Sequence, residues 1–489
     1  LFVKALPYFF KVLSVNQGLT DFVSEKSPIS IVRKDRGVSD QTASTGIIED
    51  LGDGLVIRHA QMADREPLAD LNAVADGPVG HPNEDLRQRT LEMVSSDNPV
   101  VGLHYLMLVE DLKTGRLVSS LCLLPHTWSF DGVEFEVGRI ESVNTAHEYR
   151  NRGLIRKQLN VVHNWSRARG DHVNVIFGMP YFYRQFGYEM ALELGGSRKM
   201  AIDALEKIDD TGSYIVRNAG EQDLEFITRT YEASRSRYLI ANRYGIEQWR
   251  DRLFTQRGSR KSAIVETPAG EPVGFLVYDG KVQDHSLSVY MFEADSRVSS
   301  SELSRYVLNY LEHEGWRHVS AQEPNSPSSR RTVEWILGTN HLIYGSMGDM
   351  LHAGRSQSVS YVRVADLPGF ILHIASPLNR RIAESVAAGY SGDINLSFYT
   401  GGLTMRFEEG KLVSAAPWGP SIETGWSDEG WNARFPGLTF LQLLFGFRSV
   451  DDLLHAFPDA SIDSSSTREV LNALFPTKPS SIGFEEEAV

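Results

Sequence analysis

The sequence predicts an α+β fold that is duplicated and then followed by a further α+β domain. Three observations predict it. A strand, a short loop and a helix are expected one after another over residues 137–159. The segment 55–64 recurs in altered form at 214–223, which indicates an internal repeat. Near the C-terminus, apolar residues alternate over 394–407, which is typical of an antiparallel sheet with one exposed face.

Length and composition are those of an ordinary globular chain. The 489 residues fit three domains at roughly 100–200 residues per domain. The net charge of −14, without a basic block, argues against nucleic acid as a main partner. The single cysteine, Cys122, lies in an apolar run, so we expect a buried core residue rather than a nucleophile.

Residues 1–53 are expected to form a poorly ordered extension, with a partner-docking helix as the alternative. The run 1–13 is apolar, but it is too short to span a bilayer and is interrupted by Lys4, Pro7 and Lys11. It also lacks a convincing signal-peptide cleavage site. No later run reaches the length of a transmembrane helix. We therefore expect no membrane span and predict a cytoplasmic protein.

The elements of the first domain follow from local patterns. Asp64 can cap a helix, and Asp131-Gly132 is a hairpin signal, as is the turn at 113–115. The expected order is a strand at 55–58, helices from 64 and over 83–94, strands at 105–110 and 117–124, and then the strand–loop–helix unit. That unit ends in a helix because its apolar residues recur at i, i+4 and i+7, at Ile155, Leu159 and Val162.

The loop inside this unit carries Arg150, Arg152 and Gly153. A helix N-terminus presents unpaired N–H groups and the positive end of the helix dipole, so it can receive a phosphate. Gly153 would let the backbone approach closely. From these residues alone, two interpretations stay open: a diphosphate cradle, or a helix start with two solvated arginines.

The residues after this helix narrow the choice. A strand is expected at 173–178, and then comes Pro180-Tyr-Phe-Tyr183-Arg-Gln-Phe-Gly187-Tyr188. In this order and spacing the chain resembles the GNAT family of acyl-CoA N-acetyltransferases. The family's pyrophosphate loop, Gln/Arg-x-x-Gly-x-Gly/Ala, reads here Arg150-Asn-Arg-Gly153-Leu-Ile155, and its later Tyr-x-x-x-Gly-Phe/Tyr reads Tyr183 to Tyr188. Ile155 stands where the family motif ends in a small residue. The enhanced-intracellular-survival branch of the family tolerates a bulky residue at this position.

The rest of the chain resembles that branch too. After the extension at 1–53, the resemblance implies a catalytic GNAT domain at 54–205, a degenerate GNAT-like domain at 206–357, and a sterol-carrier-like α+β domain with its C-terminal tail at 358–489. The second copy is expected to have lost its cofactor site, because the loop 295–301 has neither a glycine nor paired arginines.

The resemblance also assigns roles to residues. Acetyl-CoA would be the co-substrate, with its pantetheine arm on the backbone of Val143, Asn144 and Thr145. The remaining cofactor-binding residues would be those of the diphosphate loop and first helical turn: Arg150, Asn151, Arg152, Gly153, Leu154, Ile155 and Arg156. Tyr183 would be the general acid, since a phenol with a pKa of about 10 can protonate a leaving thiolate. Alternatively, Tyr183 packs only against its aromatic neighbours.

The general base stays open between two carboxylates. Glu141 lies on the strand where many GNAT enzymes carry a basic glutamate, but it can instead pair with Arg139 or Arg150. The resembling branch uses its own C-terminal carboxylate, which here would belong to Val489. The histidines show no metal-ligand spacing, so no metal is expected.

The predicted function is transfer of an acetyl group to a primary amine: an aminoglycoside-like polyamine, a small amine, or a lysine or N-terminal amine of a peptide. The alternative is a non-catalytic protein that binds CoA or holds an apolar ligand in its C-terminal domain. There, the apolar residues 440–445 would line a lipid cavity or, as the simpler interpretation, pack in the core. A homo-oligomer is expected, because the resembling branch assembles into hexamers.

Overall fold

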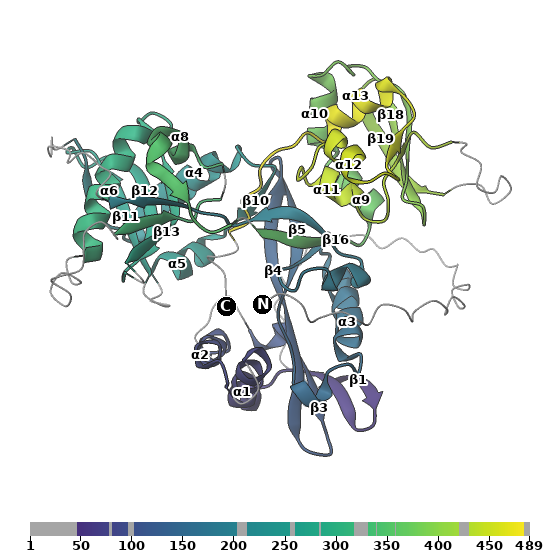
Figure 1. The fold of residues 1–489 in the computed structure, drawn as a ribbon, viewed down its shortest axis with the longest axis horizontal. Coiled ribbons are helices and arrows are strands. Elements are labelled where there is room, and N and C mark those ends of the chain that lie inside the picture. The colour runs from purple at the N-terminus through teal and green to yellow at the C-terminus, as the bar shows by residue number, and fades with distance from the viewer. Residues whose placement is uncertain are drawn as a thin grey trace, which may run out of the picture. The chain divides into compact units, whose positions relative to one another are not determined.

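A computed structural model of the chain describes residues 46–77, 81–95, 102–202, 213–254, 260–282, 285–316, 331–338, 340–356, 358–419 and 430–483. In this part of the chain the strands form three sheets, and helices pack against each of them (Figure 1). The α+β fold class predicted from the sequence is therefore confirmed. None of the described helices is long and apolar enough to cross a membrane.

The first sheet is mixed, and its described strands number nine. Its order is β1 (Ile47–Gly52), β2 (Leu55–His59), β3 (Leu106–Asp111), β4 (Arg116–Phe130), β5 (Val133–Thr145), β6 (Val173–Ile176), β16 (Ser358–Val364) and β7 (Glu189–Leu194), with β10 (Ile240–Arg243) paired to β4. Strands β5 and β6 are parallel, and the other pairs are antiparallel.

Two long helices cover the central pair β4–β5 from opposite faces. From α1 (Arg65–Asp76), Asn72 bonds Ser120 of β4, whereas from α3 (Leu154–Arg169), Gln158 bonds the preceding residue Ser119. Neighbouring strand residues point to opposite faces, so the two helices lie on opposite sides of the sheet. Figure 1 shows them on either side of β4. The helix α2 (Glu84–Met93) packs beside α1, and the Asn83 side chain caps it by accepting from the Leu86 amide.

The second sheet runs β15 (Leu351–Ala353), β8 (Arg198–Ala201), β14 (Thr332–Trp335), β13 (Ser286–Ala294), β12 (Pro272–Asp279), β11 (Arg260–Glu266) and β9 (Ile215–Asn218). Its two faces carry separate cores. One face packs on α6 (Ser300–Trp316) and α8 (Leu342–Met347), and the other on α4 (Leu224–Arg235) and α5 (Ile246–Phe254) (Figure 1).

A network of charges repeats between the first and second sheets. Arg58 binds Asp64 through two hydrogen bonds of 2.6 and 2.8 Å and also binds Glu110. At matching places, Arg217 binds Asp223 at 2.7 and 2.8 Å and also binds Glu266. This correspondence extends the sequence repeat into three dimensions and supports a duplication.

The third sheet runs β19 (Lys411–Trp418), β18 (Gly402–Glu408), β17 (Gly392–Ser397), β20 (Ala433–Arg434) and β21 (Ser461–Ile462). The helices α9 (Leu367–His373), α10 (Ala375–Ala383), α11 (Phe440–Leu444), α12 (Val450–Ala456) and α13 (Ser465–Leu474) share its core. A capping box of Ser449 and Asp452 opens α12. The apolar residues 440–445 are buried in this core, as the simpler interpretation expects.

The sheets exchange strands across the boundaries expected from the sequence. Strand β16, expected to begin the last domain, lies between β6 and β7 in the first sheet. Strand β8 pairs with β14 and β15 of the second sheet, and β10 pairs with β4 of the first. The domain boundaries at 205/206 and 357/358 remain a proposal, because strands on one side of each boundary pair with strands on the other side.

The last residues of the extension expected at 1–53 belong to the first sheet. Residues 47–52 form β1, which pairs with β2. The turn between them places Asp53 at φ 57° and Gly54 at φ 84°, and an Asp-Gly pair favours such a turn. Residues 1–45 lie outside the described part of the chain. Asp64 also differs from its expected role, since its carboxylate accepts from Arg58 and the Gln61 amide rather than capping α1.

Candidate active site

The first sheet opens where β5 and β6 part. Their pairing ends at Ile140 and Ile176, yet β5 continues to Thr145 while bonded to β4 alone. In the described strand pairings, residues 142–145 therefore have no strand neighbour on the side of β6, and we call this the free edge. Backbone N–H and C=O groups on a free edge seek partners, so this edge can bind an extended ligand that carries amides.

A β-bulge interrupts β5 at the same place. Ser120 pairs with Asn144 and Cys122 with Glu141, so Leu121 alone faces Ser142 and Val143. Ser142 takes φ 52°, which costs a residue with a side chain about 1–2 kcal/mol. Bulges are frequent next to active sites because they re-aim the groups of one strand.

The N-terminus of α3 lies in the next turn of the chain. Asn151 has φ 63° and Gly153 φ 74°, and a methyl group added at Gly153 would meet open space. The first bond within the helix runs from the Lys157 amide to the Gly153 carbonyl, so the amides of residues 154–156 precede it. The predicted cofactor residues of this loop are brought together here, and Arg150, Asn151, Arg152, Gly153 and Arg156 are exposed.

The arginines of this loop also have protein partners. Arg150 donates to the carbonyls of Thr145 and Ala75, at 3.2 and 2.8 Å. Arg152 stacks on Tyr149, and Arg156 donates to Gln185 at 2.6 Å. The side chains of Leu154, which is buried, and Ile155, which is half-buried, pack on the hydrophobic core of the first sheet. These two residues would therefore offer only their backbone amides to the co-substrate.

Tyr183 lies in a short 3-10 helix at Phe182–Phe186 and is 3% exposed. Its ring packs on Tyr361 with centroids 5.5 Å apart, and a methyl group at Gly178 would lie 3.1 Å from it. Within the described residues its hydroxyl makes no hydrogen bond. Burial raises the pKa of Tyr183 well above 10, and the nearby charge of Glu141 raises it further. The phenol thus holds its proton at every physiological pH.

Glu141 lies on β5 directly before the free edge. Its Oε1 accepts a hydrogen bond from Nε of the buried Arg139 at 2.7 Å, so the ion pair considered from the sequence is present. Its strand partner Cys122 is fully buried, as predicted, and burial together with the charge of Glu141 raises the pKa of that thiol to about 12. Cys122 therefore stays a neutral thiol.

The other predicted base, the carboxylate of Val489, lies outside the described residues. The last described residues pack near β10, where Nδ2 of Asn242 donates to the carbonyl of Ile482 and Ser481 pairs in parallel with Ala241. No group of three or more His, Cys, Asp or Glu side chains within the described ranges is placed to hold a metal ion.

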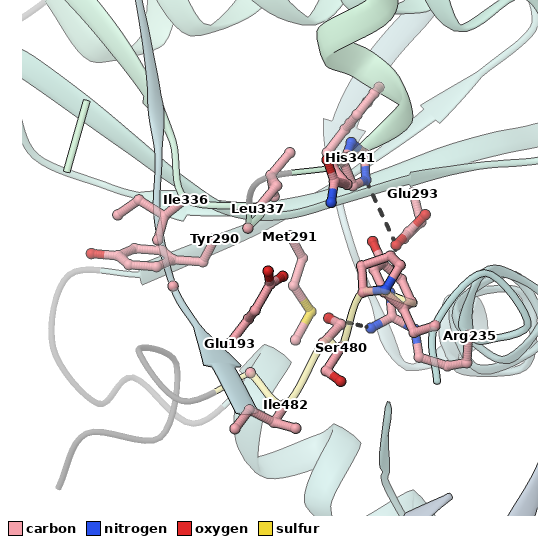
Figure 2. Close-up of a pocket in the computed structure, with 18 of the residues that line it drawn as sticks. Glu193, Arg235, Tyr290, Met291, Glu293, Ile336, Leu337, His341, Ser480 and Ile482 are labelled. Atoms are coloured by element: carbon pink, nitrogen blue, oxygen red, sulfur yellow. Dashed lines mark hydrogen bonds and ion pairs between the residues drawn. The ribbon is translucent and has the colours of Figure 1, made fainter. Parts of the chain in front are cut away.

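A separate pocket of about 70 Å³ lies where β7, β13, α4 and the tail 479–483 meet (Figure 2). Figure 2 shows Arg235, Glu293, His341 and Ser480 at one end. Arg235 binds both Glu293 at 2.6 Å and Ser481 at 2.9 Å, which fastens the tail to α4 and β13. None of the predicted site residues lines this pocket.

Two features of the site were not predicted from the sequence. Tyr361 packs on Tyr183 from β16, and its hydroxyl donates to the carbonyl of Met179. Nothing in the local sequence around Tyr361 indicates this contact, because it depends on the strand exchange. The bulge at Ser142 was also missed, since no glycine marks it.

Residues 57–191 match the family model described as an acetyltransferase (GNAT) domain. Among the curated proteins, none matches the chain. A solved structure from Enterococcus faecalis V583, described as a probable N-acyltransferase, is 15% identical with a TM-score of 0.63, over 87% of this chain and 98% of that one.

Two further structures have similar folds. A GCN5-related N-acetyltransferase from Kribbella flavida is 15% identical with a TM-score of 0.59, over 88% of this chain and 99% of that one. Eis1 from Mycobacterium abscessus is 14% identical with a TM-score of 0.54, over 87% and 99%. At these identities the likeness concerns the fold, and with the family match it supports an acetyltransferase enzyme with a GNAT-like α+β fold.

Proposed function

We propose that this chain, whose residues 57–191 match a GNAT acetyltransferase domain, transfers an acetyl group from acetyl-CoA directly to a primary amine. The observation that carries the proposal is the position of Tyr183. The residue is only 3% exposed, and its hydroxyl is protonated and makes no hydrogen bond among the described residues, next to the point where β5 and β6 part. A structural tyrosine buried to this degree would usually find a partner.

The residues present fit the co-substrate. The amides of residues 154–156 and the exposed Arg152 and Arg156 would hold the diphosphate at the positive end of α3. Gly153 leaves room for it, since a methyl group there would meet open space. The amides of the pantetheine arm would pair with the free edge at Val143, Asn144 and Thr145 as one more strand would, beside the hydrogen bond that the Thr145 carbonyl already accepts from Arg150.

The residues would then act in sequence on the bound thioester, which supplies the acetyl group. A backbone N–H of the β5 edge would stabilise the charge that develops on the carbonyl oxygen. As the amine nitrogen bonds to the acetyl carbon, a base takes the proton that the nitrogen loses. The carbon–sulfur bond breaks, and Tyr183 donates its proton to the departing sulfur. Bulk water would reprotonate the phenolate.

The base belongs to the proposal in alternative forms: Glu141, the C-terminal carboxylate of Val489, or a water molecule. One carboxylate oxygen of Glu141, Oε1, already accepts a hydrogen bond from Arg139, which makes that oxygen a weaker base. Appending residues after Val489 tests the second form, because a blocked or displaced carboxylate would lower turnover. Unaltered turnover would exclude it.

The acceptor is proposed to be a small amine, an aminoglycoside-like polyamine, or the lysine or N-terminal amine of a peptide. The net charge of −14 suits a cationic acceptor.

We further propose that residues 206–357 are a degenerate copy without a cofactor site. The repeated Arg–Asp–Glu network supports the duplication, and Arg297 at the matching loop is bound by Asp295 at 2.8 Å. We also propose that residues 358–489 form a sterol-carrier-like domain and that the chain assembles into a homo-oligomer such as a hexamer.

The test combines acetyl-CoA titration with a thiol-release assay over a panel of amines. The proposal expects saturable acetyl-CoA binding and amine-dependent release of CoA thiol with at least one amine class. Binding without release across polyamines, small amines and peptides would favour the non-catalytic alternative. Absence of acetyl-CoA binding would contradict the proposal and would leave, of the alternative, only the form that holds an apolar ligand.

A further inference from the structure

Asn72 is a buried polar residue on the apolar face of α1. It is 0% exposed, between the core residues Leu71 and Ala73. Burying an amide without partners costs several kcal/mol, so its surroundings have to satisfy it. They do: its Oδ1 accepts two hydrogen bonds, and its Nδ2 donates to Thr90 of α2 at 3.2 Å.

The two donors to Asn72 lie on different strands. The Ser120 hydroxyl of β4 donates to Oδ1 at 2.9 Å, and Nδ2 of Asn144 on β5 donates to the same oxygen at 3.0 Å. Ser120 and Asn144 are the first paired residues beyond the bulge. One oxygen from a helix thus fastens both strands at the place where their register shifts.

The bulge decides which groups of β5 face the opening. One extra residue in a strand reverses the alternation beyond it, so peptide groups that would face β4 turn to the other edge. Ser142 carries the strain, at φ 52°. Its carbonyl lies 3.3 Å from the Ser120 hydroxyl that Asn72 orients. Without a tie from outside the strands, a regular pairing would relieve this strain.

We infer that Asn72 is a positioning residue for acyl transfer: its amide oxygen holds the bulge that aims the backbone of residues 143–145 at the thioester. The inference rests on the proposed function. It separates two parts of co-substrate binding, because within the described residues the hydrogen bonds of Asn72 go to Thr90, Ser120 and Asn144 and not to the loop at the start of α3. Loss of the Asn72 oxygen should therefore weaken the polarisation of the thioester carbonyl and leave the binding of the nucleotide part of CoA unchanged.

The test compares Asn72→Leu with Asn72→Asp and Thr90→Val. Leucine removes both functions of the amide and keeps helix propensity, aspartate keeps an acceptor oxygen for Ser120 and Asn144, and Thr90→Val deletes only the partner of Nδ2. Three quantities are measured in the full chain: kcat, the Kd of CoA, and the carbonyl stretching frequency of bound acetyl-CoA labelled with ¹³C at the carbonyl.

Asn72→Leu is expected to lower kcat at least about tenfold, toward the roughly 10²–10³-fold that loss of one oxyanion donor costs. The carbonyl band should move toward its frequency in water, while the Kd of CoA changes less than about threefold. Asn72→Asp should restore kcat and band, and Thr90→Val should lower Tm alone. If Asn72→Leu fails to fold, Ser120→Ala is expected to give the same pattern.

A Tm decrease in Asn72→Leu or Ser120→Ala with kcat and carbonyl band unchanged would overturn the inference and leave Asn72 a structural residue. Wild-type protein that does not bind acetyl-CoA would overturn the proposed function itself. The two failures are thus distinguished by the wild-type titration.

Discussion

Nε of Arg139 donates a hydrogen bond to Oε1 of Glu141 at 2.7 Å, on the strand that borders the opening. Arg139 is 1% exposed, so its charge depends on this carboxylate far more than a surface arginine would. The same carboxylate is close enough to Tyr183 to raise the pKa of that phenol. Glu141 thus both pairs with a buried arginine and acts electrostatically on the proposed acid.

The change Glu141→Gln separates these two roles. Glutamine keeps an acceptor for Arg139 but removes the carboxylate charge from the buried pair, which should cost about 3–5 kcal/mol in the free energy of unfolding, measured with urea. If Glu141 is also the base, kcat falls about 10²-fold or more and the acidic limb of the pH–rate profile disappears. Full turnover in a destabilised variant would assign Glu141 to the ion pair alone.

Gly153→Ala should weaken the binding of CoA. An added methyl group strains a residue at φ 74° by about 1–2 kcal/mol and projects into the open space at the start of α3. We expect the Kd of CoA, measured by calorimetry, to rise about tenfold. Gly170→Ala is the matched control, since Gly170 ends the same helix at φ 96° with equally open surroundings. Equal changes in Kd for both variants would contradict the cradle.

The pH dependence of turnover should lack a descending limb from Tyr183 below pH 10. Burial and the charge of Glu141 raise its pKa, so the proton-donating form persists throughout the usual assay range. A kcat profile measured from pH 6 to 10 should therefore show only the ascending limb of the base. A fall in kcat with an apparent pKa near 9 that disappears in Tyr183→Phe would show that the phenol ionises in the wrong range for this role.

Glu293 should contribute to stability in a defined pH window. Burial alone would raise its pKa, but His341, 3.8 Å away, and the charges of Arg235 and Arg237 lower it from 4.5 to about 2. A carboxyl whose pKa is lower when folded stabilises above its unfolded pKa and loses that contribution as the pH falls. The contribution, roughly 3 kcal/mol, is thus present above pH 4.5 and lost toward pH 2.

Urea unfolding of wild type and Glu293→Gln between pH 2 and 7 measures this contribution. The stability difference between the two proteins should shrink as the pH falls through the window. Asp393→Asn removes an exposed pair with Arg406 and serves as the control, with little change at any pH. A difference between wild type and Glu293→Gln that is constant with pH would contradict the assignment.

Features encoded in contiguous residues could be predicted from the sequence. The turn before α3 follows from Arg150 to Gly153, and the hairpin at Asp131-Gly132 follows from its two positive-φ residues. The repeat is visible in sequence because Arg217 and Asp223 lie only six residues apart, as Arg58 and Asp64 do.

Features that depend on distant segments could not be predicted in this way. Tyr361 reaches Tyr183 only because β16 inserts between β6 and β7, and strand insertion leaves no mark in either local sequence. Asn72 meets Asn144 across 72 residues. A polar residue on the apolar face of a predicted helix was the available signal, and it indicates a buried partner without naming it.

The kcat of Tyr183→Phe, measured beside the Kd of acetyl-CoA, tests the central claim most directly. Phenylalanine keeps the ring contacts with Tyr361 and removes only the proton donor, and Tyr181→Phe, at a neighbouring residue that is 74% exposed, serves as the control. The account predicts that kcat falls about 10²–10⁴-fold in Tyr183→Phe while the Kd is unchanged and the control is fully active. A Tyr183→Phe enzyme with wild-type kcat would contradict it.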